Sequence, residues 1–242
     1  MISNLGSLVV NCWLFPVSGG CALVDTGYAG GYDRFRRRLE RRGLSLRGIR
    51  YVFLTHAHDD HAGFLNDLLL DAPHIRVICS PGALPVLRRG QNGFSGGCTS
   101  RLAQLFCRGM ALWGRGDHRF PPLPPVLEDR CLPVTEEARP ALETALGGRI
   151  LATPGHTADS LSLLLPDGSL FCGDAAMSGF PSLRHITIWA EGAAAFSRSW
   201  ERLLSLKVRR IYPGHGRPFA PQALERCLPA ARAMPLYPLP SR

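Results

Sequence analysis

Several apolar, strand-like runs of this chain end directly in histidine or aspartate. Residues 51–54 read Tyr-Val-Phe-Leu, and residues 56–61 then read His-Ala-His-Asp-Asp-His. Three later runs of the same kind end at His156, Asp174 and His215. Side chains at the ends of neighbouring strands converge in space while remaining far apart in sequence. The pattern therefore predicts a sheet protein that gathers these titratable groups in one place.

The apolar patterning predicts strands in groups, with helices between the groups. Strands are expected at 8–15, 21–25, 49–55, 74–79, 149–153, 160–165, 169–173 and 208–212. Helices are expected at 32–42, 61–71, 81–88, 100–113, 193–206 and 221–232. This order of elements indicates an α/β fold with two sheets that helices cover on the outside.

Residues 89–140 differ from the rest because glycine and proline are dense around one helical candidate at 100–113. A long irregular stretch inside a compact domain is more often functional than part of the core. We therefore expect one domain over residues 1–242, with a lid inserted at about 89–140. Larger apolar side chains of this segment either line a substrate pocket or pack the lid against the body: Phe94, Phe106, Met110, Trp113 and Phe120.

The gathered imidazoles and carboxylates predict a metal site. Neutral imidazole and carboxylate ligands without thiolates suit Zn²⁺, with Fe or Mn as alternatives. The candidate ligands are too many for one tetrahedral ion and about right for two. Water held between two cations would lose a proton near neutral pH and become a good nucleophile. The candidates are His56, His58, Asp60, His61, His156, Asp174 and His215.

These motifs resemble those of the metallo-β-lactamase-fold hydrolases. The stretch HAHDDH at 56–61 is similar to the family's H-x-H-x-D-H signature, and Asp-Thr-Gly at 25–27 is similar to its structural aspartate turn. The later elements follow in the family's order, as PGHT at 154–157, CGDA at 172–175 and PGHG at 213–216. The resemblance extends over nearly the whole chain. It implies a four-layer αββα sandwich of two mixed β-sheets flanked by helices, with the metals at the sheet edge.

By this resemblance, two divalent metal ions are expected, with zinc favoured and Fe or Mn as alternatives. The first ion would be held by His56, His58 and His156, and the second by Asp60, His61 and His215, with Asp174 between them. Asp60 could also orient the nucleophile or accept its proton, so Asp60 and Asp174 are the candidate catalytic residues. Asp59 occupies the variable position of the motif, and Asp25 is expected to organise the backbone.

The implied reaction is hydrolysis, in which a hydroxide bridging two metals attacks an ester, thioester or lactone carbonyl of a small molecule. Many lactamases of the superfamily have cysteine where this chain has Asp174, which favours its other hydrolases. Only a short segment follows His215, so the C-terminal domain of glyoxalase II-type thioesterases is not expected. Single-domain lactonases that cleave acyl-homoserine lactones fit better, although they place tyrosine where this chain has Met177.

A phosphodiesterase or nuclease remains an alternative, because the net charge is +9 and nearly all of the basic side chains are arginine. The densest run, residues 34–42, has Phe35 and Leu39 at helical spacing, which favours the solvated face of an amphipathic helix over a nucleic-acid site. A non-catalytic metal-binding sensor on the same fold is the other alternative. Nucleic acid is therefore not the favoured partner, and a small-molecule substrate is.

The remaining features are ordinary for a globular protein. The eight cysteines contain no C-x-x-C pair, so buried reduced thiols are expected. No apolar run is long enough to span a bilayer and the start lacks a secretory signal, so we expect cytoplasmic residence and no membrane partner. His74, His118 and His185 are not expected to be ligands, although His118 and His185 lie in loops that could reach a substrate. The sequence leaves homo-oligomerisation open.

Overall fold

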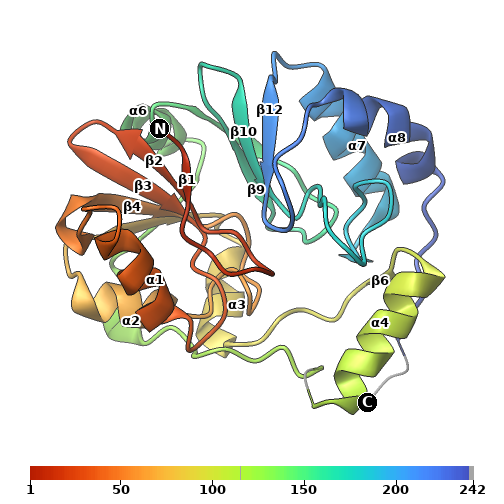
Figure 1. Cartoon of the computed structure of the whole chain (residues 1–242), viewed down its shortest axis with the longest axis horizontal. Coiled ribbons are helices and arrows are strands. Elements are labelled where there is room, and N and C mark those ends of the chain that lie inside the picture. The colour runs from red at the N-terminus through yellow and green to blue at the C-terminus, as the bar shows by residue number, and fades with distance from the viewer. Residues whose placement is uncertain (115, 240–242) are drawn as a thin grey trace. The chain divides into compact units, whose positions relative to one another are not determined.

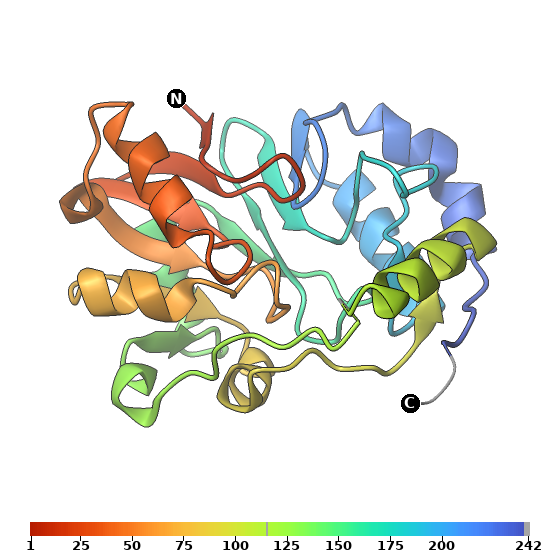
Figure 2. The same cartoon turned by 60° about the horizontal axis from the view of Figure 1, so that its bottom comes forward.

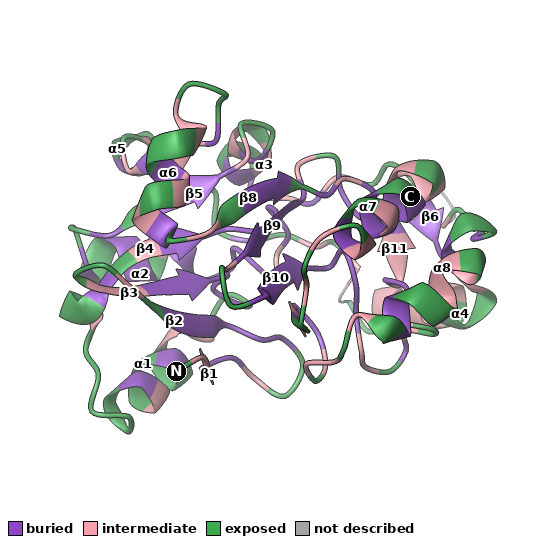
Figure 3. Cartoon of the chain, turned by 90° about the horizontal axis from the view of Figure 1, so that it is seen from above, coloured by how far each residue is buried: buried purple, intermediate pink, exposed green. Residues whose placement is uncertain are grey.

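The structure, a computed structural model, describes residues 1–114 and 116–239, and these residues form two compact units (Figure 1). Unit 1 comprises Met1–Asn92 and Arg119–Ile150, and unit 2 comprises Gly93–His118 and Leu151–Arg242. Each unit has its own sheet and its own cluster of buried apolar side chains. The strands of these sheets are largely buried, whereas most helices expose one face (Figure 3).

Unit 1 contains a six-stranded sheet in the order β1-β2-β3-β4-β5-β7. Its strands are β1 (Ser3–Asn4), β2 (Trp13–Val17), β3 (Gly20–Val24), β4 (Ile49–Phe53), β5 (Arg76–Cys79) and β7 (Cys131–Pro133). The β2–β3 pair is an antiparallel hairpin, and β3, β4, β5 and β7 run parallel to one another. The carboxyl ends of β3 and β4 therefore lie side by side at one edge of the sheet.

The helices of unit 1 bury apolar residues and leave charged ones in water. They are α1 (Tyr32–Glu40), α2 (Leu65–Asp71), α3 (Ala83–Arg89), α5 (Pro125–Glu128) and α6 (Arg139–Leu146), with a 3₁₀ turn at Leu46–Gly48. In α1, Phe35 and Leu39 are buried, while Arg36 is exposed and contacts Asp71 at 3.2 Å. The arginine run of α1 is thus a solvated helix face, as predicted.

Unit 2 contains a four-stranded sheet in the order β12-β10-β9-β8 and a two-stranded sheet of β11 and β6. Its strands are β6 (Gly97–Cys98), β8 (Arg149–Ala152, whose first two residues are counted with unit 1), β9 (Leu161–Leu164), β10 (Ser169–Gly173), β11 (Trp189–Ala190) and β12 (Arg210–Pro213). The helices are α4 (Arg101–Leu112), α7 (Ala193–Leu204) and α8 (Gln222–Arg232). Strands β10 and β12 are parallel neighbours, so the residues that follow them also meet at one edge.

Two predicted elements begin four or five residues later than expected. The strand predicted at 8–15 begins at Trp13, because the Ser7 hydroxyl accepts hydrogen bonds from the backbone N–H groups of Val9 and Val10 and forms a turn there. The helix predicted at 61–71 begins at Leu65, because the residues from His61 onward are used in a tight turn. The apolar residues of these turns continue the hydrophobic pattern of the strand and of the helix, so the pattern alone extends each predicted element too far.

Residues 89–140 are divided between the two units. Residues 93–118 belong to unit 2 and contain α4, whose predicted extent is confirmed by Ser100 as its N-cap and Trp113 as its C-cap. The later residues belong to unit 1, where β7 joins the sheet and Phe120 is buried in the apolar cluster. Phe120 therefore packs the core of unit 1. That the remainder acts as a lid stays a prediction.

All eight cysteines are free thiols; five of them are buried, as the sequence predicted, and the other three are half-buried. Burial, together with the nearby Asp25 carboxylate, raises the pKa of Cys12 well above its usual range. This thiol therefore stays protonated near neutral pH and offers no thiolate ligand. Among the described helices, none has the length and apolar character needed to cross a bilayer.

Candidate metal centre

The carboxylate of Asp25 organises the histidine-rich loop of unit 1. Asp25 follows β3 and the loop follows β4, so the parallel pairing of these strands places them together. The backbone N–H of Thr55 donates to Asp25 Oδ1 at 2.8 Å, and the Thr55 hydroxyl donates to Oδ2 at 2.8 Å. His61 Nδ1 lies 2.8 Å from the same Oδ2. Asp25 adopts φ +60°, a left-handed conformation that aspartate tolerates better than most residues.

This network fixes which ring nitrogen each histidine presents. A carboxylate only accepts, so His61 carries its proton on Nδ1 and presents the Nε2 lone pair on the other side of the ring. The Thr55 hydroxyl gives its hydrogen to Asp25, so it accepts from His56 Nδ1 at 3.0 Å. His56 therefore presents Nε2 as well. Hydrogen bonds of this kind orient imidazole ligands and set their tautomer in metal sites.

The backbone of the same loop is held tightly. Both the N–H and the hydroxyl of Thr26 donate to the His61 carbonyl, at 2.7 and 3.0 Å. Gly63 lies so close to the preceding turn that a Cβ there would meet the backbone nitrogen of Ala29 at 2.2 Å and the Asp59 carbonyl at 2.5 Å. Glycine at this position is therefore required for the close approach of the two backbones.

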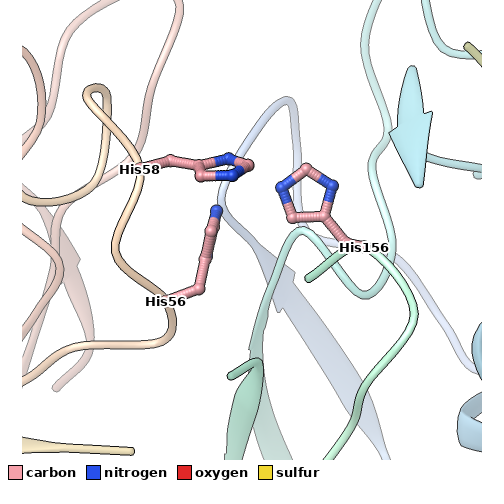
Figure 4. Close-up of side chains that lie close together, drawn as sticks. All are labelled: His56, His58 and His156. Atoms are coloured by element: carbon pink, nitrogen blue, oxygen red, sulfur yellow. The ribbon is translucent and has the colours of Figure 1, made fainter. Parts of the chain in front are cut away.

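The ligand candidates of unit 1 lie close to one another. The ring centroids of His56 and His58 are 4.6 Å apart, and those of His56 and His61 are 4.1 Å apart. His61 Nε2 lies 3.7 Å from Asp60 Oδ1. Figure 4 shows His56 and His58 on the loop after β4, with a nitrogen of His56 directed toward the His58 ring. Unit 1 alone thus holds a compact cluster of three imidazoles and one carboxylate.

Asp59 is not one of these ligand candidates, and it is hydrogen-bonded to Asn92. The Asp59 N–H donates to Asn92 Oδ1 at 2.8 Å, and Asn92 Nδ2 donates to Asp59 Oδ1 at 2.8 Å. This reciprocal pair fixes the middle of the histidine loop. Asn92 carries no motif signal in the sequence, so its supporting role was not predicted.

In unit 2, His156 lies in the loop after β8 and is oriented by backbone. Its Nδ1 lies 2.8 Å from the carbonyl oxygen of Trp189, which only accepts, so Nδ1 carries the proton and Nε2 is again the presented nitrogen. The Thr187 hydroxyl lies 3.2 Å from the same Nδ1. Figure 4 shows His156 on this loop of unit 2.

Asp174 and His215 follow the parallel neighbours β10 and β12, which explains why they meet. His215 Nε2 lies 3.5 Å from Asp174 Oδ2, and His156 Nε2 lies 3.8 Å from the same oxygen. Unit 2 therefore brings one carboxylate and two imidazole Nε2 atoms together. The nearby Cys172 directs its thiol toward the carbonyls of Gly173 and Ala176, away from a ligand role.

A glutamate that the sequence analysis did not identify supports the His156 loop. Glu191 accepts hydrogen bonds from the Ala158 N–H at 2.6 Å and from the Ser95 hydroxyl at 3.0 Å. The Trp189 ring N–H donates to the Ser95 carbonyl at 3.1 Å, and the Thr99 hydroxyl donates to the Thr187 carbonyl. Residues 93–99 are therefore tied to the segment that orients His156. No short motif signals these contacts.

The other three histidines have structural contacts. His74 Nε2 lies 3.2 and 3.1 Å from the carbonyls of Leu46 and Ile49. His185 donates from Nδ1 to the Met177 carbonyl at 3.1 Å and stacks on Phe219, and its burial lowers its pKa. His118 lies with its ring centroid 6.2 Å from that of Phe94. That the loops of His118 and His185 could reach a substrate stays a prediction.

The side chains of both units fit divalent metal ions by their chemistry. The candidate ligand atoms are imidazole Nε2 and carboxylate oxygens, which Zn, Fe and Mn all accept. Three of the imidazoles have the Nδ1 hydrogen bond that metal-ligating histidines usually make: His56, His61 and His156. The chain therefore has a potential metal-binding histidine cluster.

Comparison with known sequences identifies the family. The profile of the "Metallo-beta-lactamase superfamily" matches residues 5–215. The uncharacterized protein YobT of Bacillus subtilis is 26% identical over 204 residues, which cover 84% of this chain and 77% of that protein. The "Beta-lactamase-like protein 2 homolog" of Drosophila melanogaster is 38% identical over 74 residues, which span 28% of this chain but only 21% of that protein.

Solved structures agree in fold. A metallo-β-lactamase from Cronobacter sakazakii, the HARLDQ motif mutant S60, has a TM-score of 0.68 at 20% identity, covering 96% of this chain and 89% of that chain. The protein TTHA1623, solved in a di-iron-bound form, has a TM-score of 0.62 at 26% identity, covering 93% of this chain and 97% of that chain. The predicted α/β fold class, with mixed sheets and flanking helices, is confirmed. The chain belongs to the metallo-β-lactamase superfamily.

Proposed function

We propose that this protein is a metal-dependent hydrolase that cleaves an ester, thioester or lactone bond of a small molecule. The observation that carries the proposal is the Asp25 network. It fixes two histidines of the H-x-H-x-D-H motif with Nδ1 protonated and Nε2 presented, as a metal site needs. The network buries the polar side chains of Asp25, His56 and His61, and apolar packing alone would not require polar groups there.

The proposed centre holds two divalent metal ions, with zinc favoured. Iron is the first alternative, because the structurally similar protein TTHA1623 was solved in a di-iron-bound form. One ion would be held by His56, His58 and His156, the other by Asp60, His61 and His215, with Asp174 shared. When bound, such ions would activate water at neutral pH and polarise the substrate carbonyl.

The chain's own side chains have separate tasks in this proposal. Asp174 supplies one carboxylate close to two imidazoles, with Oδ2 at 3.5 Å from His215 Nε2 and 3.8 Å from His156 Nε2. Its negative charge would reduce the repulsion between two cations held there. Asp60 is partly exposed, with Oδ1 at 3.7 Å from His61 Nε2, and would orient the attacking water or accept its proton.

Carbonyl rather than phosphodiester substrates are proposed because the densest arginine run lies on the solvated face of an amphipathic helix. Arg36 contacts Asp71 and Glu40 on this face, and Phe35, the aromatic residue within the run, is buried and cannot stack on bases. A small-molecule substrate and a cytoplasmic location complete the proposal. Phosphodiester turnover and metal binding without turnover are the two competing outcomes.

The test combines metal analysis with a substrate panel. Protein purified without added metal is analysed by inductively coupled plasma mass spectrometry. It is then assayed on aryl ester, thioester, lactone and bis-nitrophenyl phosphate substrates, with and without added zinc, iron or manganese. We expect about two metal equivalents and chelator-sensitive turnover of a carbonyl substrate. Fewer than about one equivalent, with no gain on adding metal, would contradict a dinuclear hydrolase.

A matched pair of variants locates the activity. Asp174→Asn should lower both metal content and turnover, because it removes the charge shared by the proposed ions. Asp33→Asn makes the same chemical change at an exposed position of α1 and should leave both unchanged. Equal behaviour of the two variants would show that Asp174 has no special role.

A further inference from the structure

Helix α4 exposes a row of large apolar side chains. Leu105 is 69% exposed, Leu112 is 87% exposed and the C-cap residue Trp113 is 81% exposed. Leu102, Leu105 and Leu112 recur at three- and seven-residue intervals, so they lie on one face of the helix. Ala103 is the residue of α4 that is buried, on the opposite side. In Figure 3 the helix is exposed or intermediate over most of its length.

The apolar surface continues from α4 onto a neighbouring loop of the same unit. The ring centroids of Phe106 and Phe180 lie 6.4 Å apart, with the rings edge to face. Phe180 is 80% exposed, and Leu183 of the same loop is 48% exposed. Figure 2 shows α4 following β6 along the outside of unit 2. Contiguous exposed apolar surface of this kind marks a site of interaction.

Basic side chains border this surface. Arg101 and Arg108 are exposed and seven residues apart, so both lie along one side of the apolar row. The sequence of α4 contains no acidic residue. Arg184 is exposed next to Leu183 in the neighbouring loop, and the whole chain carries a net charge of +9. The surface therefore combines leucine and tryptophan with flanking arginines, as do helices that lie in the plane of a membrane interface.

We propose that α4 and the loop containing Phe180, together the α4 surface, dock onto a lipid bilayer that contains anionic lipids. The apolar row would enter the boundary between headgroups and acyl chains, and the arginines would remain among the phosphates. A second copy of the chain would bury the same leucines, but across a two-fold interface it would bring Arg101 and Arg108 toward the partner's own arginines. The charge therefore favours an anionic lipid surface over self-association.

This docking is peripheral and independent of the proposed hydrolase activity. The sequence prediction of no membrane partner rests on the lack of a spanning segment. Docking through α4 requires only one exposed amphipathic helix of 12 residues. It places unit 2 at the lipid surface, whatever the substrate is.

Trp113 is a built-in reporter of the contact. Trp13 and Trp200 are buried and Trp189 is half-buried, so Trp113 is the exposed tryptophan of the described chain. Titration with vesicles of phosphatidylcholine and phosphatidylglycerol should shift its emission to shorter wavelength, because the indole leaves water. Vesicles of phosphatidylcholine alone should give a much weaker response, and added salt should weaken binding to the anionic vesicles. Trp113→Phe should lose the spectral shift while still sedimenting with the vesicles.

Paired variants separate the α4 surface from general stickiness. Leu105→Gln combined with Leu112→Gln should weaken vesicle binding about tenfold or more, because two apolar anchors are lost. Leu70→Gln is the matched control, since Leu70 is 64% exposed on α2 of unit 1, and it should bind as the parent does. Arg101→Gln combined with Arg108→Gln should reduce the preference for anionic vesicles. Thermal melts of all variants should match the parent, because each side chain is exposed.

Three results would each overturn the proposal. One is the absence of any Trp113 shift or co-sedimentation with anionic vesicles. Another is unchanged vesicle binding when both leucines are replaced. The third is a Trp113 shift that grows with protein concentration in the absence of lipid, together with a dimer in analytical ultracentrifugation, since the α4 surface would then be a contact between copies of the chain.

Discussion

The two units orient their histidines by different means. In unit 1, the side chain of Asp25 holds His61 directly and His56 through a threonine hydroxyl. In unit 2, the backbone carbonyl of Trp189 holds His156. A side chain can be removed by one substitution, whereas a carbonyl is present whatever residue occupies the position. The histidine loop of unit 1 should therefore be far more sensitive to single substitutions than the His156 loop.

The largest effect is expected for Asp25→Asn. Asparagine tolerates the left-handed backbone of position 25, but its NH₂ group cannot accept from the donors that now meet the two carboxylate oxygens. His56 and His61 should then lose their fixed tautomer, and metal affinity should fall about 10- to 100-fold. Competition with a fluorescent chelator measures this directly. A circular dichroism spectrum like that of the parent would exclude unfolding as the cause, and unchanged affinity would contradict the assigned role.

An intermediate effect is expected for Thr55→Val, which keeps the shape of the side chain and removes its hydroxyl. His56 would lose the acceptor of its Nδ1 proton, while His61 would keep its own bond to Asp25. Metal affinity should fall less than in Asp25→Asn, and the lost buried hydrogen bonds should cost about 1–3 kcal/mol of unfolding free energy. Chelator competition and urea unfolding check the two parts. A loss as large as that of Asp25→Asn would show that the hydroxyl, rather than the carboxylate, organises the loop.

A smaller effect is expected for Thr187→Val in unit 2. The hydroxyl lies 3.2 Å from His156 Nδ1, but the Trp189 carbonyl at 2.8 Å remains as the acceptor. The Thr187 carbonyl also keeps its bond from Thr99, because it belongs to the backbone. Metal affinity should stay within about threefold of the parent. A loss comparable to that of Thr55→Val would break the distinction between the two units.

This distinction also explains what the sequence could predict. The ligand candidates and Asp25 stand in short motifs, because their chemistry requires a particular side chain at a particular spacing. Trp189 orients His156 through its backbone carbonyl. Glu191 accepts a hydrogen bond from the backbone N–H of Ala158, which lies more than 30 residues away in the sequence. Neither kind of contact leaves a local pattern, so these supports were visible only in the folded chain. The same holds for Asn92 and Asp59.

The elements of the fold were predicted well where apolar periodicity decides the structure and poorly where a turn does. Helix α4 and the strands before the ligands lie where the patterns placed them. The first strand begins late because Ser7 closes a turn, leaving Leu8 fully exposed. Strand β7 was missed inside the glycine- and proline-rich segment, since its three residues give too short a pattern to recognise. Short elements are defined by their partners in the sheet.

The smallest effect concerns His185, which donates to a backbone carbonyl as His156 does but packs on Phe219. Burial lowers its pKa below the ordinary 6.5, so between the lowered pKa and 6.5 the unfolded chain binds more protons than the folded one. The contribution of His185 to stability is therefore complete above pH 6.5 and is lost as the pH falls below it. Urea unfolding at a series of pH values should show a slightly shallower loss of stability below that pH in His185→Gln than in the parent. Equal slopes would show that His185 is as easily protonated in the folded chain as in the unfolded one. The hydrogen bond to the Met177 carbonyl, which favours the protonated ring, would then offset the effect of burial on the pKa.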